Sequence, residues 1–215
     1  MKFCVIGISK FGYEAATILA NNGVDVLAID QDSTKVEHIR DKVAQAACIK
    51  IIDADSLYKI GIEEMDGVIV SLANNFTDTA ILVRILRHTF DIKTIIACTN
   101  NQVKAVILET LGADQIIKPE IEAAIRLADS LSSPFTHMTR LHNDLAIIEI
   151  ITPTKFIGKT IREVLFYEHY QILCIAIKRD ETIIVSTPEM TIEENDLLIL
   201  SGLTPALNSL PKEFR

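Results

Sequence analysis

The chain has 215 residues, of which 49% are hydrophobic and 23% are charged, and its net charge at pH 7 is −8. No apolar run approaches the roughly 18 residues that a membrane-spanning helix requires, and the N-terminus lacks the pattern of a signal peptide, so we expect a cytoplasmic protein. The acidic balance and the lack of a basic stripe argue against a nucleic-acid partner.

Strands and helices alternate over the first two thirds of the sequence. Strands are predicted at 3–7, 24–30, 47–52, 67–72, 94–98 and 115–118, and helices at 11–23, 33–42, 55–62, 76–90 and 101–111. The strand segments are continuously apolar, which is typical of a parallel sheet covered on both faces. The order predicts an α/β fold with a doubly wound, Rossmann-like parallel sheet of six strands.

The last third of the chain has a different pattern. A helix at 119–132 is followed by a linker at 132–137, and strands are then predicted at 145–151, 170–179, 181–186 and 196–202 around one short helix at 159–166. We expect a turn of a hairpin at 178–182. The sequence thus predicts two domains, a nucleotide-binding domain at 1–135 and a smaller α+β domain at 139–215.

The segment "GISKFG" resembles a dinucleotide-binding loop of the form G-x-G-x-x-G, with Gly7 and Gly12 at the outer positions and Ser9 at the middle one. Gly7 allows the tight turn after the first strand, and Gly12 lets the first helix pack close to the sheet. Ser9 either displaces the phosphates with its Cβ or donates its hydroxyl to a phosphate oxygen. A doubly wound domain that has lost its ligand is the alternative interpretation.

Asp30 ends the second strand, 18 residues after Gly12. A carboxylate near this spacing binds the ribose diol in dinucleotide-binding folds. The negative charge, with no Arg close behind it, disfavours NADP.

Few residues in the sequence point to catalysis. His38 and His88 lie on charged helix faces, His137 and His142 flank the linker, and His169 precedes a strand. None has the spacing of a zinc site, and Cys4, Cys48, Cys98 and Cys174 form no C-x-x-C pair, so we expect buried, reduced thiols. We expect a binding protein and no enzyme, with an NAD-dependent oxidoreductase as the alternative.

Three motifs resemble one family over the whole chain. They are "FCVIGISKFGYEAATILANNGVDVLAIDQD", "DADSLYKIGIEEMDGVIVSL" and "VILETLGADQIIKPE", and residues 139–215 are similar to the C-terminal module of the same family. The chain resembles the RCK/KTN family of TrkA- and KtrA-type regulatory subunits of potassium uptake systems. The family usually has Gly and Arg where this chain has Ser9 and Lys10.

The resemblance implies a set of nucleotide-binding positions. These are Gly7, Ser9, Lys10, Phe11, Gly12, Asp30, Gln31, Asp53, Ala54, Asp55, Ser71, Ala73 and Glu120. It implies ATP/ADP or NAD(H) as the ligand, and a divalent or monovalent cation near the phosphates, with Glu120 as the candidate although no metal site is firm. A second site for cyclic di-AMP in the C-terminal domain would use Ile157, Ile161 and Pro188.

The resemblance also implies partners. It predicts homodimers that assemble into an octameric ring, and an integral-membrane potassium-translocating subunit of KtrB or TrkH type. The protein would then lie at the cytoplasmic face of the cell membrane, held there by its partner.

Overall fold

The structure is a computed structural model that describes residues 1–50, 53–72, 75–132, 135, 137–141 and 144–214. The chain divides into two compact units, Met1–Glu122 and Ala123–Arg215. Each unit has its own hydrophobic core, and each is described by itself below.

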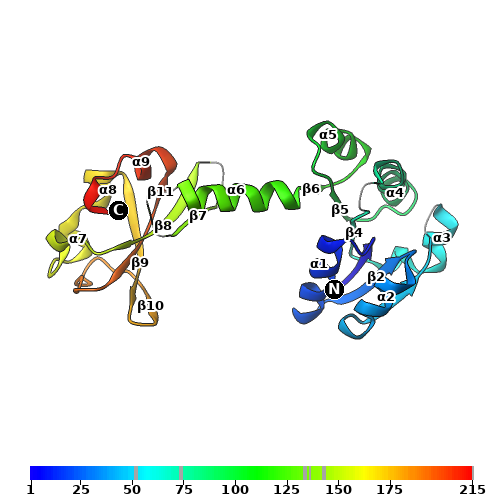
Figure 1. The fold of residues 1–215 in the computed structure, drawn as a ribbon, viewed down its shortest axis with the longest axis horizontal. Helices are drawn as coiled ribbons and strands as arrows, with labels where there is room; N and C mark the ends of the chain where they lie inside the picture. The colour runs from blue at the N-terminus through cyan, green and yellow to red at the C-terminus, as the bar shows by residue number, and fades with distance from the viewer. Residues whose placement is uncertain (51–52, 73–74, 133–134, 136, 142–143, 215) are drawn as a thin grey trace. The chain divides into compact units, whose positions relative to one another are not determined.

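The first unit alternates strands and helices (Figure 1). Its strands are β1 (Lys2–Ile6), β2 (Asp25–Asp30), β3 (Gln45–Cys48), β4 (Gly67–Val70), β5 (Thr94–Cys98) and β6 (Gln115–Ile117). Its helices are α1 (Lys10–Asn21), α2 (Ser33–Ile39), α3 (Ala54–Lys59), α4 (Phe76–His88) and α5 (Gln102–Leu111), with 3-10 turns at Arg40–Lys42 and Ile62–Glu64.

The six strands form one parallel sheet in the order β3-β2-β1-β4-β5-β6. This is the order of a doubly wound Rossmann-like sheet, and the prediction of fold class is confirmed. The chain starts in β1, builds outward to β3, and returns to the other side of β1 to begin β4. The carboxyl ends of β1 and β4 therefore mark the point at which the winding reverses.

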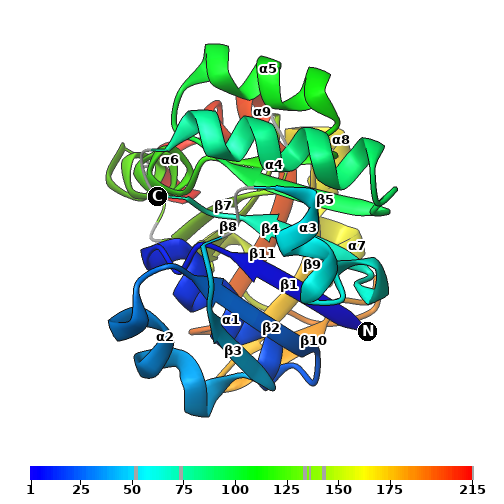
Figure 2. The same cartoon turned by 90° about the vertical axis from the view of Figure 1, so that its right-hand side faces the viewer.

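Both faces of this sheet are buried. Val5, Val26 and Ala28 pack on one face with Ala16 of α1 and Ile39 of α2. The alternate strand residues, including Cys4, Ile6 and Ile29, pack on the other face with Leu57, Leu82 and Leu108 from α3, α4 and α5. Figure 2 shows α4 and α5 on one side of β1 and β4, and α1 and α2 on the other. The continuous apolar strands follow from this double coverage.

Helix α6 (Pro119–Ser132) begins in the first unit and continues into the second. Pro119 occupies its first turn with Glu120 and Glu122, as the sequence predicts. The predicted boundary between 135 and 139 falls in a segment that the structure describes only in part, and it stays a prediction.

The second unit is built on a five-stranded antiparallel sheet. Its strands are β7 (His137–Arg140), β8 (Leu145–Ile151), β9 (Ile172–Arg179), β10 (Thr182–Val185) and β11 (Leu197–Leu203), in the order β10-β9-β11-β8-β7. Its short helices are α7 (Ile161–Val164), α8 (Phe166–Tyr170) and α9 (Thr204–Asn208), with 3-10 turns at Thr154–Phe156 and Lys212–Phe214. The predicted smaller α+β domain is thus confirmed.

Four elements differ from the predictions. The strand predicted at 47–52 is instead β3, which starts at Gln45 and ends at Cys48. Cys48 pairs with Asp30, the last residue of β2. The predicted helix at 159–166 is two helices, because Leu165 between them has a left-handed φ of 54°. Strand β7 was not predicted, since its sequence HMTR is polar and its pairing with β8 is a tertiary contact. Helix α9 was not predicted either.

The cysteines follow the prediction only in part. Cys4 is buried, and Cys98 and Cys174 are half-buried, with burial raising their pKa to about 11 and about 12. Cys48 is exposed instead, because β3 is the edge strand of its sheet. The thiols of Cys98 and Cys174 are therefore protonated at neutral pH.

An ion pair with one buried partner joins the end of β9 to the start of β11 in the second unit. Asp196, of which 1% is exposed, accepts hydrogen bonds from Arg179 Nε at 2.8 Å and Arg179 Nη2 at 2.9 Å. It also accepts one from the backbone N–H of Glu193 at 2.7 Å. Burial opposes the ionisation of Asp196, but Arg179 and this N–H outweigh burial and lower its pKa.

Replacing Asp196 with Asn should lower the free energy of unfolding of the second unit by about 2–3 kcal/mol at neutral pH, because Arg179 loses its buried anionic partner and keeps only the more exposed Glu193. The stability that this carboxylate contributes is present above its unfolded pKa of about 3.9 and is lost as the pH falls through the lower folded pKa. The difference between the two proteins should therefore shrink below about pH 4. Urea unfolding followed by circular dichroism measures both effects.

The matched control is Glu189→Gln, which removes an ion pair with Arg162 in which both side chains are 68% exposed. We expect it to change stability by less than about 0.5 kcal/mol. Equal losses for the two variants at neutral pH would contradict the interpretation of the Asp196 cluster.

Candidate functional site

The loop after β1 depends on two glycines for its shape. Gly7 has a φ of +94°, and a Cβ there would lie 2.5 Å from the carbonyl oxygen of Ser71. A Cβ on Gly12 would lie 2.2 Å from the carbonyl oxygen of Gly7. The tight turn and the close approach of α1 to the sheet are the roles that the sequence predicts for these residues.

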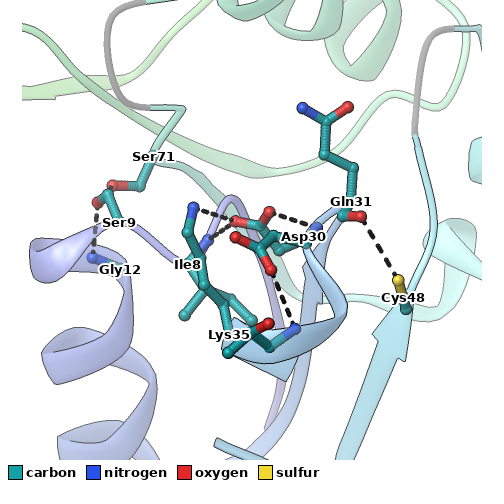
Figure 3. A network of polar contacts seen from close by, with 10 residues as sticks. Ile8, Ser9, Gly12, Asp30, Gln31, Lys35, Cys48 and Ser71 are labelled. Carbon is teal, nitrogen blue, oxygen red and sulfur yellow. Dashed lines mark hydrogen bonds and ion pairs between the residues drawn. The ribbon is translucent and has the colours of Figure 1, made fainter. Parts of the chain in front are cut away.

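Ser9 is the N-cap of α1. Its hydroxyl accepts a hydrogen bond from the N–H of Gly12 at 3.1 Å and shares another with the Ser71 hydroxyl at 2.6 Å (Figure 3). From the sequence, Ser9 was expected either to displace the phosphates or to donate a hydrogen bond to a phosphate oxygen. The structure shows that its hydroxyl also stabilises the loop, by capping the helix and by joining it to the end of β4.

Asp30 connects the second strand to the same loop. One carboxylate oxygen, Oδ2, accepts from the backbone N–H of Ile8 at 2.7 Å and lies 3.2 Å from Lys35 Nζ. The other oxygen, Oδ1, accepts from the N–H of Asp32 at 3.0 Å. Figure 3 shows the contacts of Ile8 and Lys35 meeting at the Asp30 carboxylate.

Asp30 is an anion at neutral pH although only 9% of it is exposed. Burial raises the free energy of its charged form, but the N–H groups of Asp32 and Ile8 and the ammonium of Lys35 outweigh burial and lower its pKa. The structure therefore places a fixed negative charge beside the loop.

Two cavities lie beside this loop. The larger one, about 550 Å³, is lined by Ser9, Lys10, Phe11, Ser71, Leu72, Asn75, Phe76, Thr79, Cys98, Thr99, Asn100, Asn101, Lys104, Pro119 and Glu120. The smaller one, about 120 Å³, is lined by Ile6, Gly7, Ser9, Ile29, Asp30, Gln31, Lys35, Ile49, Lys50, Ser71, Leu72, Asn75 and Asp78. They share Ser9, Ser71, Leu72 and Asn75, so they form the two sides of one crevice at the point where the winding reverses.

The electrostatics of the crevice suit an anion at its centre. Helix α1 has 12 residues and no acidic residue in its own first turn, so its positive N-terminal end favours an anion at the loop. Lys10 in that turn and Lys104 on α5 both line the larger cavity. Lys104 lies over the ring of Phe76, 5.2 Å from its centroid.

The structure brings most of the predicted site residues together. Gly7, Asp30 and Gln31 line the smaller cavity, Lys10, Phe11 and Glu120 line the larger one, and Ser9 and Ser71 line both. Gly12 lies directly under the loop, and Ala73 lies outside the described residues.

The start of α3 contributes to neither cavity. Asp53 caps α3 by accepting from the backbone N–H of Ser56 at 2.9 Å and from its hydroxyl at 2.6 Å, and these bonds lower its pKa. Ala54 and Asp55 occupy the first turn of the helix. Their role in binding stays a prediction.

The candidates for a second ligand all belong to the C-terminal unit. Ile157 follows the 3-10 turn after β8 and is 38% exposed, and Ile161 is the first residue of α7. The carbonyl of Pro188 accepts from the N–H of Arg162 at 3.0 Å, which holds the segment at 188–192 against α7. These residues form part of neither cavity described above.

Several lining residues were missed from the sequence: Lys35, Lys50, Asn75, Thr99, Asn100, Asn101 and Lys104. A signal was present, because the stretches "SLANN" and "TNN", which contain several polar residues, directly follow β4 and β5. In an open parallel sheet, residues just beyond the carboxyl ends of the strands line the ligand crevice. Lys35 had no comparable signal.

In the described part of the chain, no three or more His, Cys, Asp or Glu side chains form a group that could hold a metal ion. Glu120, the candidate from the sequence, accepts a hydrogen bond from the amide of Asn100 at the rim of the larger cavity.

The fold and the crevice define a Rossmann-like, doubly wound α/β domain linked to a small α+β domain. Comparison with known families then identifies the family: the chain belongs to the TrkA-N domain family, which matches residues 3–119, and carries a TrkA-C domain at 145–215. The assignment made from the sequence motifs is confirmed.

A similar relative is the Ktr system potassium uptake protein C of Bacillus subtilis. It is 29% identical over 214 residues, covering 98% of this chain and 96% of the relative. The similarity therefore includes both domains.

Two solved structures share the fold. The GsuK channel bound to NAD has a TM-score of 0.56 and 24% identity over 97% of this chain, and GsuK bound to ADP has a TM-score of 0.53 and 24% identity over 61% of it. This chain covers 37% and 34% of those chains, so it spans about a third of their length. A search of the described helices found none long and apolar enough to cross a membrane.

Replacing Gly12 with Ala should lower the free energy of unfolding by about 2–3 kcal/mol, because the new Cβ must displace the backbone of Gly7. Thermal unfolding followed by circular dichroism measures the loss. Gly23→Ala is the control: Gly23 has a φ of +82° but no atom within 4 Å of the added Cβ, so only the cost of the left-handed conformation, about 1 kcal/mol, is expected. A loss no larger than the control's would contradict the close approach at Gly12.

Proposed function

We propose that this protein is a cytoplasmic regulatory subunit of a potassium uptake system, and that it binds an adenine nucleotide in the crevice between β1 and β4. The observation that carries the proposal is a hydrogen bond between the loop after β1 and Asp30. The backbone N–H of Ile8 donates to Asp30 Oδ2 at 2.7 Å. The proposed ribose acceptor, Asp30, and the proposed phosphate site, the loop after β1, are therefore held at a fixed separation. This suits a ligand that contains both a ribose and a phosphate.

The chemistry of each part fits one part of such a ligand. The Asp30 carboxylate is an acceptor for ribose hydroxyls, and the N-terminus of α1 with Lys10 favours phosphate oxygens. The relative in Bacillus subtilis is named a potassium uptake protein, and solved structures with the same fold carry NAD or ADP. These similarities support both the ligand class and the process.

The ligand that we propose for the crevice is ATP/ADP or NAD(H). All of them share the adenosine diphosphate part, which would extend from Asp30 to the loop. The larger cavity of about 550 Å³ has room beyond the loop for a third phosphate beside Lys10 and Lys104 or for a second nucleoside. We place a cation near the phosphates at Glu120 as part of the same proposal.

Regulation would act through a shift of population between two arrangements of an oligomer. A ligand shifts such an equilibrium only if it binds the two arrangements with different affinity. We propose homodimers that assemble into an octameric ring and contact an integral-membrane potassium-translocating subunit. Lys10 and Glu120 at the rim of the larger cavity are the residues that would distinguish nucleotides differing beyond the second phosphate.

The C-terminal domain would sense a second ligand. Cyclic di-AMP, with Ile157, Ile161 and Pro188 as apolar walls, is the candidate that follows from the family resemblance. Isothermal titration calorimetry of the full chain with cyclic di-AMP tests this part separately from the nucleotide crevice.

Replacing Asp30 with Ala should abolish binding of ADP, ATP and NADH, because the ribose loses its acceptor and Ile8 loses its partner. Asp30→Asn should weaken binding at least tenfold, since it keeps one acceptor oxygen but not the charge. Calorimetry on the purified full chain measures both. Asp41→Ala, an exposed acid in the 3-10 turn after α2, is the charge-matched control. Unchanged affinity in both Asp30 variants would contradict the crevice as the nucleotide site.

The process is tested in the organism that carries the gene. Deleting the gene should reduce rubidium uptake, which reports on potassium transport, and the wild-type gene should restore it. Uptake that is unchanged by the deletion under potassium limitation would contradict a role in potassium transport.

A further inference from the structure

The side chain of Lys35 occupies an unusual position on its helix. It lies in the first turn of α2, where the positive end of the helix disfavours a cation. Its Nζ lies 3.2 Å from Asp30 Oδ2, and Lys35 lines the smaller cavity. The attraction of the Asp30 carboxylate, and not a preference of the helix, therefore explains where this ammonium lies.

The carboxylate of Asp30 has limited capacity for hydrogen bonds. Each of its oxygens can accept about two. Oδ2 already accepts from Ile8 and Lys35, and Oδ1 accepts from Asp32. These three contacts leave about one position, on Oδ1.

A ribose diol needs two positions, since each hydroxyl donates one hydrogen bond. The N–H groups of Ile8 and Asp32 belong to the backbone of the loop and of the β2–α2 connection, and moving them would distort both. Lys35 differs, because its flexible side chain is 43% exposed while that of Asp30 is only 8% exposed. Its ammonium can move into water without any change in the backbone.

We propose that Lys35 and the ribose of the nucleotide compete for Asp30, so that Lys35 is a residue that limits the affinity of this site. The proposal rests on the proposed function, because it needs a nucleotide in the crevice. Binding then exchanges one charge-assisted contact for hydrogen bonds from the ribose. Every nucleotide that carries the diol must displace Lys35, and this displacement weakens its binding.

The test compares ADP binding to the full-length wild type and to Lys35→Met by isothermal titration calorimetry. Met is nearly as good a helix former as Lys and keeps the length of the chain, so α2 should persist. The variant should bind ADP about fivefold more tightly, because a change of this size corresponds to the free energy of one partly exposed ion pair. Lys59→Met, an exposed lysine in the last turn of α3 that lines neither cavity, is the charge-matched control and should leave the affinity unchanged.

A second probe separates competition from a general charge effect. The ligand 2′,3′-dideoxy-ADP lacks both hydroxyls but leaves the bond between Asp30 and Ile8 intact, so it should still bind through its phosphates, more weakly than ADP. Lys35→Met should change its affinity less than about twofold. An equal gain for ADP and the dideoxy compound would overturn competition, as would ADP affinity in Lys35→Met that is equal to or weaker than that of the wild type. If ADP binds to none of the three proteins, the proposed function itself fails; binding that is identical in wild type and Lys35→Met overturns only the role of Lys35.

Discussion

The contact on which the rest of the site depends is the hydrogen bond from the Ile8 N–H to the Asp30 carboxylate, 2.7 Å long and buried. It joins the loop after β1 to the end of β2, so the loop and the Asp30 carboxylate hold a fixed position relative to each other. The neighbouring N–H of Asp32 and the ammonium of Lys35 keep the carboxylate ionised in spite of burial. A charged group buried in this way needs hydrogen-bond donors in place of water, and two of its donors, the N–H groups of Ile8 and Asp32, belong to the backbone.

The two sides of the crevice have different characters. The side at Asp30 is small and has an acidic and a basic group in contact with each other. The side beyond the loop is larger, and its polar lining consists of amides, hydroxyls, two lysines and Glu120. Ser9 and Ser71 lie at the junction and bond to each other. The residue that departs from the glycine pattern is thus part of the link between α1 and β4.

The sequence predicted the fold well and the site in part. Gly7, Gly12 and Asp30 were found because their roles depend on short segments, a turn, a helix start and a strand end. The polar residues after β4 and β5 were missed because they become a site only when the strands lie side by side. Asp53 was placed in the site by resemblance, while in the structure its carboxylate caps α3 and lines neither cavity.

The sequence by itself determined the alternation of strands and helices, the two-domain pattern and the shape of the loop, since apolar periodicity, glycine and capping act over a few residues. Only the tertiary structure decided that Lys35 shares Asp30 with the loop, that the Ser9 hydroxyl reaches Ser71, and that β7 completes the second sheet. The Ser9 contact joins residues that are distant along the chain, whereas β7 pairs with β8, the strand that follows it. The Lys35 contact depends on how α2 turns back over the end of β2. The physical reason is that each of these contacts needs the surrounding fold to hold its two partners together.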